Sequence, residues 1–334
     1  MTRSDTRSSV RVPDHPTMLA AMRLTVRAPS VHNTQPWRWV FDGVRLHLYG
    51  DPERQLPATD PRGRQGTISC GAALNHARTA FSVHGWQTDV VRLPDPEVAE
   101  LLATIRFHPW PDLSPTVTER ARAIDRRRSD RLPLRDPRGW AELLPKLHDL
   151  VTPHDLVLDV LGPNDRGRLA ALSDRSEAVR HYDRMYQAEL DWWAGHAEQP
   201  DGIPPVALVS RAEAARVGVD RVFPAPRNGL RRPGLVDQAR LVVLSSHDDT
   251  SLCWLQTGEA LSALLLECTA HGLATCALTH VTELPVDRRA IAALIPGRGI
   301  PQVVVRIGTA PDDDEPPPPT PRRPLVDVFT ELPA

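Results

Sequence analysis

The sequence has little of what several common classes of site require. Lys146 is the only lysine among its 40 basic residues, which excludes the lysine-containing phosphate loop of nucleoside triphosphatases. Its 4 cysteines lack the C-x-x-C spacing of zinc and redox sites. The motifs H-E-x-x-H, G-x-S-x-G and G-x-G-x-x-G are also absent. The composition therefore gives no support to a metal site, a serine hydrolase or a dinucleotide-binding fold of the usual kind.

A strong net charge and long apolar runs are missing too. The formal net charge is -2 in 334 residues, so no overall field favours nucleic acid or a membrane surface as a partner. No apolar run reaches the roughly 18 residues that a membrane span needs. Residues 1–13 are polar, unlike a signal peptide. We expect a cytoplasmic protein with reduced cysteines, and its length leaves room for two modest domains.

The stretch from Arg27 to Trp39, R-A-P-S-V-H-N-T-Q-P-W-R-W, has the most restricted backbone that the sequence predicts. Pro29 and Pro36 each fix φ and bias the preceding residue toward an extended shape. Short polar side chains lie between them, and the residues after Pro36 predict a buried strand. The residues alone leave two interpretations open. The loop either presents polar groups to a planar ligand or is a structural turn closed by a core tryptophan.

Two long helices, each ended by a His-Gly pair, predict an internal repeat. We expect these helices over residues 68–84 and 252–271. Six identities between them share one ungapped offset of 187 residues (258 − 71). The pairs are Gly71 with Gly258, Ala73 with Ala260, Leu74 with Leu261, His84 with His271, Gly85 with Gly272, and Thr88 with Thr275. The repeat predicts two copies of one domain, at 1–110 and 111–334, although two similar helix ends can also arise by chance.

Four further segments are less decisive. Residues 98–105 predict a short helix or a linker, and residues 166–193 predict one long helix. Residues 195–234 are dense in proline and glycine, and so long an irregular segment is either disordered or a lid. The run Arg127-Arg128-Ser129-Asp130-Arg131 is either a solvated arginine-rich helix end or a pair of guanidinium forks suited to a phosphate.

The residues from Pro29 to Trp37 resemble the P-S-x-x-N-x-Q-P-W loop of the FMN-dependent nitroreductase family. The longer form resembles the Acg-type branch, whose members carry two nitroreductase-like halves in one chain. The resemblance implies an α+β, nitroreductase-like fold in which two repeats form an internal pseudo-dimer. Proteins of this family are intertwined dimers in which one subunit supplies the loop to each flavin site. The other subunit supplies an R-x-S-x-R element and a C-terminal basic pair.

These family elements are divided between the two halves. The first half keeps the loop but lacks an R-x-S-x-R element, and the second half keeps Arg127–Arg131 but lacks a second loop. We therefore expect one FMN per chain, at the interface of the halves, in a monomer that could pair again. The cofactor-binding residues that the resemblance implies are Pro29, Ser30, Asn33, Gln35, Arg127, Ser129, Arg131, Ala277, Leu278, Thr279, Arg322 and Arg323.

The resemblance also gives individual roles. It implies that the Asn33 side chain addresses the polar edge of the flavin, whereas Gln35 is structural. One of Arg322 and Arg323 faces the phosphate, and the sequence P-R-R-P leaves open which. Where the family often reads P-x-E-G beside the flavin, this chain departs and reads A-L-T-H. The last of these residues, His280, is either a proton donor or a structural histidine.

Two functions follow from the resemblance. In the first, NAD(P)H reduces the bound FMN, which passes a hydride to a nitroaromatic or quinone acceptor. In the second, the chain stores or senses FMN, and the segment at 195–234 lies over the flavin as a lid that excludes NAD(P)H. Anaerobic reduction of the flavin by NAD(P)H separates the two functions.

Overall fold

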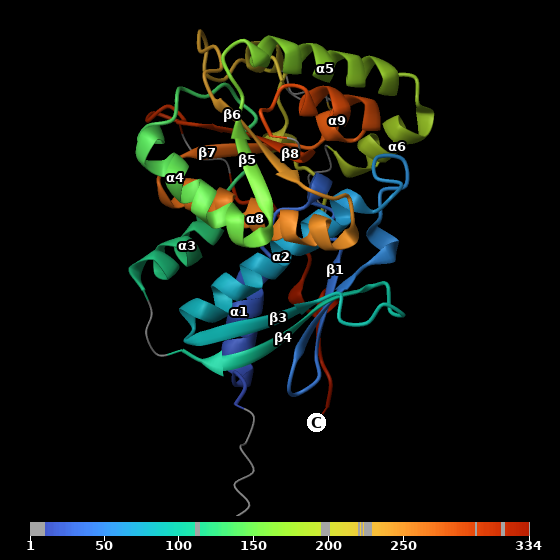
Figure 1. Cartoon of the computed structure of the whole chain (residues 1–334), viewed down its shortest axis with the longest axis vertical. Coiled ribbons are helices and arrows are strands. Elements are labelled where there is room, and N and C mark those ends of the chain that lie inside the picture. Colours follow the sequence, from blue (N-terminus) through green and yellow to red (C-terminus); the bar gives the residue numbers. More distant parts are fainter. Residues whose placement is uncertain are drawn as a thin grey trace, which may run out of the picture.

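The computed structural model describes residues 11–110, 114–194, 201–219, 221, 223, 229–297, 299–314 and 318–333. These residues form an α+β architecture with two sheets, one on each side of a central pair of helices (Figure 1). Among them, no helix is both long enough and apolar enough to cross a membrane.

The first sheet has five strands in the order β3-β4-β2-β1-β9. Neighbours are antiparallel, except that β9 runs parallel to β1. Its strands are β1 (Trp37–Phe41), β2 (Leu46–Gly50), β3 (Trp86–Arg92), β4 (Leu101–Pro109) and β9 (Phe329–Glu331). The helical elements of this part are α1 (His15–Thr25), η1 (Val31–Asn33), η2 (Pro52–Arg54) and α2 (Arg64–Val83), with η6 (Leu325–Asp327) before β9.

The second sheet has four antiparallel strands in the order β7-β8-β6-β5. They are β5 (Leu156–Val160), β6 (Arg240–Ser246), β7 (Ala274–Leu278) and β8 (Ile300–Gly308). The helices around it are α3 (Pro115–Arg126), α4 (Trp140–Val151), η3 (Thr152–His154), α5 (Asp165–Arg180), α6 (Arg184–Trp193), η4 (Pro205–Ala207), α7 (Arg211–Val217), α8 (Ser251–Ala270), η5 (His280–Thr282) and α9 (Pro285–Ala292).

The two sheets share one topology. In chain order, the first four strands of each half make a sheet in the order third-fourth-second-first. A 20-residue helix joins the second strand to the third in both halves, as α2 in the first and α8 in the second. The exception is β9, because the C-terminal segment returns to the first sheet and pairs with β1. This return brings residues 320–323 close to the loop before β1.

The residues of the first hairpin show why the chain folds this way locally. Trp37 and Trp39 of β1 are fully buried, and the residue between them is exposed. The Asp42 carboxylate accepts hydrogen bonds from Val44 N and Arg45 N, and Gly43 takes a φ of 88° that its missing Cβ permits. The aspartate-glycine turn therefore fixes the register that points both tryptophans into the core.

The two central helices touch at a pair of glycines. A Cβ on Gly71 would lie 2.9 Å from Gly258 Cα, and a Cβ on Gly258 would lie 2.7 Å from Gly71 Cα. The neighbouring Ile68 of α2 packs into the core of the second half, while Leu255 of α8 packs into the core of the first. Each half therefore buries one apolar side chain in the other, at a crossing that only glycine allows.

Three expectations from the sequence are wrong in part. Residues 98–105 lead into strand β4 rather than a helix, because Ile105 and Phe107 alternate with outward-facing polar residues between β2 and β3. The helix expected at 166–193 is two helices, and the Asp183 carboxylate caps the second by accepting from Tyr186 N. The segment 195–234 contains helix α7, which begins with a capping box of Ser210 and Glu213.

We predict that Gly258→Ala lowers the free energy of unfolding by about 2 kcal/mol or more, because the new Cβ overlaps the backbone of α2. Chemical denaturation measures the change. The matched control is Gly167→Ala in the exposed part of α5, where a Cβ meets no atom within 4 Å. There alanine should add up to about 1 kcal/mol of stability. Equal stability of Gly258→Ala and the wild type would contradict the close helix crossing.

Candidate functional site

A cavity lies where the two halves meet. It has two connected parts, of about 110 Å³ and about 580 Å³. Both parts are lined by residues of the loop before β1 and by residues of the segment after α3. The smaller part also reaches α2, the inner side of α8, and β7 with the residues that follow it. The shared lining residues are Pro29, Ser30, His32, Arg127, Ser129, Arg131 and Ile203.

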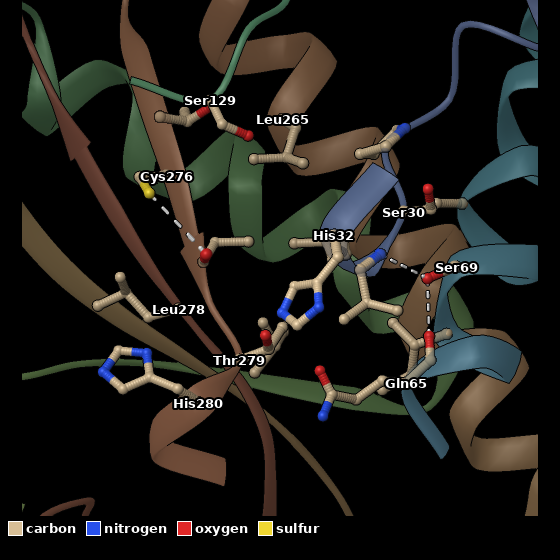
Figure 2. A pocket seen from close by; sticks show the side chains of 18 of the residues that line it. Ser30, His32, Gln65, Ser69, Ser129, Leu265, Cys276, Leu278, Thr279 and His280 are labelled. Carbon is tan, nitrogen blue, oxygen red and sulfur yellow. Dashed lines mark hydrogen bonds between the residues drawn. The ribbon is translucent and has the colours of Figure 1, made fainter. Parts of the chain in front are cut away.

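The loop before β1 is held in a constrained shape. Ser30 Oγ accepts from Gln35 N at 2.9 Å, and Val31 N donates to Ser69 Oγ on α2 at 3.0 Å (Figure 2). Three of its non-glycine residues have φ in the left-handed region: His32 at 46°, Asn33 at 57° and Gln35 at 51°. Such conformations cost about 1–3 kcal/mol each and persist only when surrounding contacts impose them. These strained conformations therefore lower the stability of the fold, and the surrounding contacts hold the three side chains in place.

Two guanidinium groups, that of the buried Arg127 and that of the half-buried Arg322, face the larger part of the cavity, and neither pairs with a carboxylate of the described residues. Among the described residues, none accepts a hydrogen bond from the Arg127 side chain. Arg322 donates only to backbone carbonyls, including Arg27 O at 3.1 Å, and its Nε has no acceptor. Burial, and then the neighbouring guanidinium groups, lower the pKa of Arg127 to about 10 and that of Arg322 to about 9. A bound anion would satisfy these donors and offset the cost of burying two positive charges.

The other two candidate arginines have protein partners. Arg131 lines the cavity, but its Nη1 donates to Ala207 O at 3.3 Å and its guanidinium lies 5.5 Å from the centre of the Phe223 ring. Arg323 is not among the lining residues, and its Nη1 lies 3.5 Å from the Asp51 carboxylate. Of the C-terminal pair, therefore, Arg322 is the residue at the cavity.

Strand β7 lines the cavity and also pairs with the arginine-rich segment after α3. The segment after α3 pairs with it, and Asp130 N donates to Thr275 O at 2.8 Å. This pairing sets Ser129 beside Thr275. The expected residues Ala277, Leu278 and Thr279 all line the smaller part of the cavity. The apolar strand end and the arginine-rich segment are thus adjacent parts of one wall.

His280 lies at the edge of the same pocket, beyond Leu278 (Figure 2). Its Nε2 is 2.7 Å from Ser173 Oγ of α5. Burial, and then the nearby Arg221, lower its pKa to about 3, so the ring is neutral at physiological pH. A neutral ring held by a hydroxyl group favours the structural interpretation over the proton donor.

A segment of the second half lines part of the cavity, and we call its described residues 201–219, 221 and 223 the lid. Ile203, Arg221 and Phe223 line the smaller part. The lid is fastened at both ends. Asp201 pairs with Arg54, and Arg221 pairs with the buried Glu283. These ion pairs hold the lid against the first half at one end and against the η5 region at the other.

Two proteins of known sequence resemble this chain over most of its length. The chain is 44% identical over 311 residues to the Mycobacterium tuberculosis protein named "Putative NAD(P)H nitroreductase acg", covering 93% of this chain and 94% of that protein. It is 37% identical over 332 residues to "Putative NAD(P)H nitroreductase Rv3131" of the same organism, covering 95% and 92%. The chain belongs to the Acg-type nitroreductase family.

The other comparisons add little to this assignment. No family model matches the chain. A solved nitroreductase with bound FMN from Bacteroides fragilis is 15% identical, with a TM-score of 0.37, over 60% of this chain and 92% of that chain. A likeness this weak carries no argument about the site.

The side chains of two loop residues of this Acg-type protein, Asn33 and Gln35, bond to other segments of the chain. Asn33 Nδ2 donates to Gly202 O at 2.9 Å and to Pro321 O at 3.2 Å, so its amide holds the lid and the C-terminal segment to the loop. Gln35 is buried outside the cavity lining, and its Oε1 accepts from Arg323 N at 2.9 Å. Both side chains therefore join segments that are far apart in the sequence.

Sequence reasoning missed several lining residues of the site. His32 lies inside the loop motif, at a position where the family pattern allows any residue. Arg221 and Phe223 lie in a segment without periodicity, where no sequence signal points to the cavity. Gln65 and Ser69 line the cavity from α2. Their polarity on the inward face of a largely buried helix was the one available signal.

We predict that sulfate stabilises the ligand-free protein beyond its effect as a salt. At 100 times its dissociation constant, sulfate should add about 2.7 kcal/mol to the free energy of unfolding. Thermal unfolding in sulfate and in chloride of equal ionic strength measures the gain, and two variants separate specific binding from the general stabilising effect of sulfate. Arg322→Gln should lose most of this gain, whereas Arg323→Gln should keep it. Equal gains in both variants would show that the buried guanidinium group does not bind the anion.

Proposed function

We propose that the protein binds one FMN between its halves and uses it to pass a hydride from NAD(P)H to a nitroaromatic or quinone acceptor. The observation that carries the proposal is the pair of the buried Arg127 and the half-buried Arg322, which have no carboxylate partner among the described residues and lie at the cavity that the loop before β1 also lines. A ligand that suits this cavity is planar and carries a dianionic tail, as FMN does. The names of the relatives supply NAD(P)H as the hydride donor.

The residues divide the work of holding such a ligand. Arg127, Ser129 and Arg322 would hold the phosphate through charge-assisted hydrogen bonds. The loop and the end of β7 would flank the ring, and Leu261 and Leu265 of α8 keep that end of the cavity apolar. Bound FMN supplies the hydride chemistry, so the protein's part is to orient the reactants and exclude water.

We also infer that the two halves form an internal pseudo-dimer. In a two-fold dimer, a residue near the axis contacts its own counterpart in the other subunit. Here counterparts are 187 residues apart, and Asn75 Nδ2 donates to Ser262 Oγ at 2.9 Å across that interval. Arg62 Nη1 contacts the Asp249 carboxylate at 3.2 Å across the same interval. The crossing of α2 and α8, with its two facing glycines, follows this symmetry as well.

From this symmetry we infer where a second, unused site would lie. Three residues that line the cavity, Ala72, Leu265 and Thr279, have the counterparts Glu259, Arg78 and Arg92 at the 187-residue offset (259 − 72, 265 − 78, 279 − 92). These counterparts fill the equivalent space with charge. The Glu259 carboxylate is fully buried and accepts from Arg92 Nε at 2.6 Å and from Arg78 Nη1 at 3.2 Å. His154 Nδ1 lies 4.0 Å from the same carboxylate.

This cluster supports one cofactor per chain. A carboxylate held by two guanidinium groups occupies the volume that alanine and threonine leave open in the first cavity. Removing one partner would leave a buried charge uncompensated, so the cluster resists opening. The second half also supplies no counterpart of the Pro29–Trp37 loop. The chain therefore retains one cavity in which both kinds of contact meet.

A second function, storage or sensing of FMN, is favoured by the lid. Ile203, Arg221 and Phe223 lie over the part of the cavity where the ring would be held. A nicotinamide needs that space to stack on the ring. If the lid stays closed, the bound cofactor is protected from NAD(P)H, and the protein sequesters it.

Anaerobic titration of the yellow protein separates these functions. We expect NADPH to bleach the flavin absorption band, because in a reductase the lid opens and lets the nicotinamide stack on the flavin ring. Dithionite, which is small, serves as the control for a flavin that is chemically reducible. Bleaching by dithionite alone would assign the protein to sequestration. A protein that stays colourless after incubation with FMN would contradict both functions.

A further inference from the structure

His32 occupies an unusual position in the cavity. Its side chain is 7% exposed, and its imidazole projects among the lining side chains near Gln65 and Thr279 (Figure 2). Its φ of 46° is left-handed, a conformation that is costly for a residue with a Cβ. The edge of the ring meets Phe223 of the lid, with 6.1 Å between ring centres. Backbone strain is thus maintained at the residue that places a polar ring inside the cavity.

The lid fixes the tautomer of this ring. Arg221 Nη1 lies 2.7 Å from His32 Nε2, and a guanidinium group can only donate. His32 Nε2 must therefore accept, which leaves the ring neutral with its proton on Nδ1. Burial, together with the charges of Arg221 and Arg131, holds the pKa of His32 well below its usual value. Arg221 is itself fixed by its ion pair with Glu283.

The Nδ1–H group is the second hydrogen-bonding group of the His32 ring. Among the described residues, none accepts a hydrogen bond from His32 Nδ1, and the atom is buried. A buried donor without an acceptor is unfavourable, and the position of this one inside the cavity means that a bound ligand can supply the acceptor. Asn33, the neighbour expected to donate to the flavin, instead donates its amide N–H groups to Gly202 O and Pro321 O.

We propose that His32, rather than Asn33, is the hydrogen-bond donor of the loop to the bound heterocycle, and that Arg221 positions it by fixing the tautomer. The recognised group is an acceptor on a planar ring, either a carbonyl oxygen or an unprotonated nitrogen. The isoalloxazine ring of FMN carries such atoms along its polar edge. The carbonyl or nitro oxygen of an oxidising substrate is a second source of the same chemistry, and we assign the flavin. The inference rests on the proposed function.

The test compares two substitutions of one residue. His32→Phe keeps a flat ring but removes the donor, and His32→Asn places an amide N–H close to the position of Nδ1 and tolerates a left-handed φ. His32→Phe should weaken FMN binding about two- to tenfold, shift the visible flavin spectrum and change the midpoint potential. His32→Asn should restore all three toward the wild type. Fluorescence quenching, absorption spectra and dye-equilibrated reduction measure them without any acceptor substrate.

His154→Phe is the matched control for the loss of a buried histidine. His154 ends η3, the short helix that precedes β5 as η1 precedes β1, and it lies beside Glu259 outside the cavity. This variant should keep the wild-type spectrum and potential, even if its stability falls.

Two results would overturn the inference while leaving the proposed function intact. The first is a His32→Phe protein that binds FMN with unchanged affinity, spectrum and potential. The second is an effect confined to the KM of a quinone acceptor, which would assign the donor to the substrate instead of the flavin. Failure of the wild-type protein to bind FMN would instead contradict the proposed function itself.

Discussion

The close crossing of α2 and α8 is the constraint on which the rest of the structure depends. Gly71 and Gly258 let the two backbones meet, and each helix then buries a side chain in the core of the opposite half. In the internal pseudo-dimer that we propose, this crossing would orient one half relative to the other as two subunits of a dimer are oriented. The loop before β1 and the segment after α3, about 100 residues apart, meet at one cavity as a result.

The cavity and the equivalent position at the Glu259 cluster differ in their charged groups. On one side, the buried Arg127 and the half-buried Arg322 have no carboxylate partner among the described residues, and a phosphate would offset the cost of their desolvation. On the other side, the Glu259 carboxylate pairs with Arg78 and Arg92 within the chain. One position is therefore prepared for an anionic ligand, and the other supplies its own anion. The return of the C-terminus to β1 completes the first position by delivering Arg322.

How much the sequence predicts depends on the range of the interaction. The loop residues Pro29 to Asn33 and the glycines Gly71 and Gly258 carry local signals, and they lie at the cavity and at the helix crossing. Strand β4 was missed because residues 101–104 fit either period, and pairing with two neighbouring strands decides between them. The partnership of His32 with Arg221 spans 189 residues and depends on an irregular segment, so no local pattern encodes it. The choice between Arg322 and Arg323 likewise depends on Asp51, which the sequence does not place beside them.

We propose that two repeats with equivalent topology make a single cofactor site. Isothermal titration of the flavin-free protein with FMN tests this claim most directly, because it reports the number of sites together with their affinity. We expect a stoichiometry close to one FMN per chain. A stoichiometry near two would show that the Glu259 cluster does not close the second position, and the absence of binding heat and of a yellow complex would contradict the site altogether.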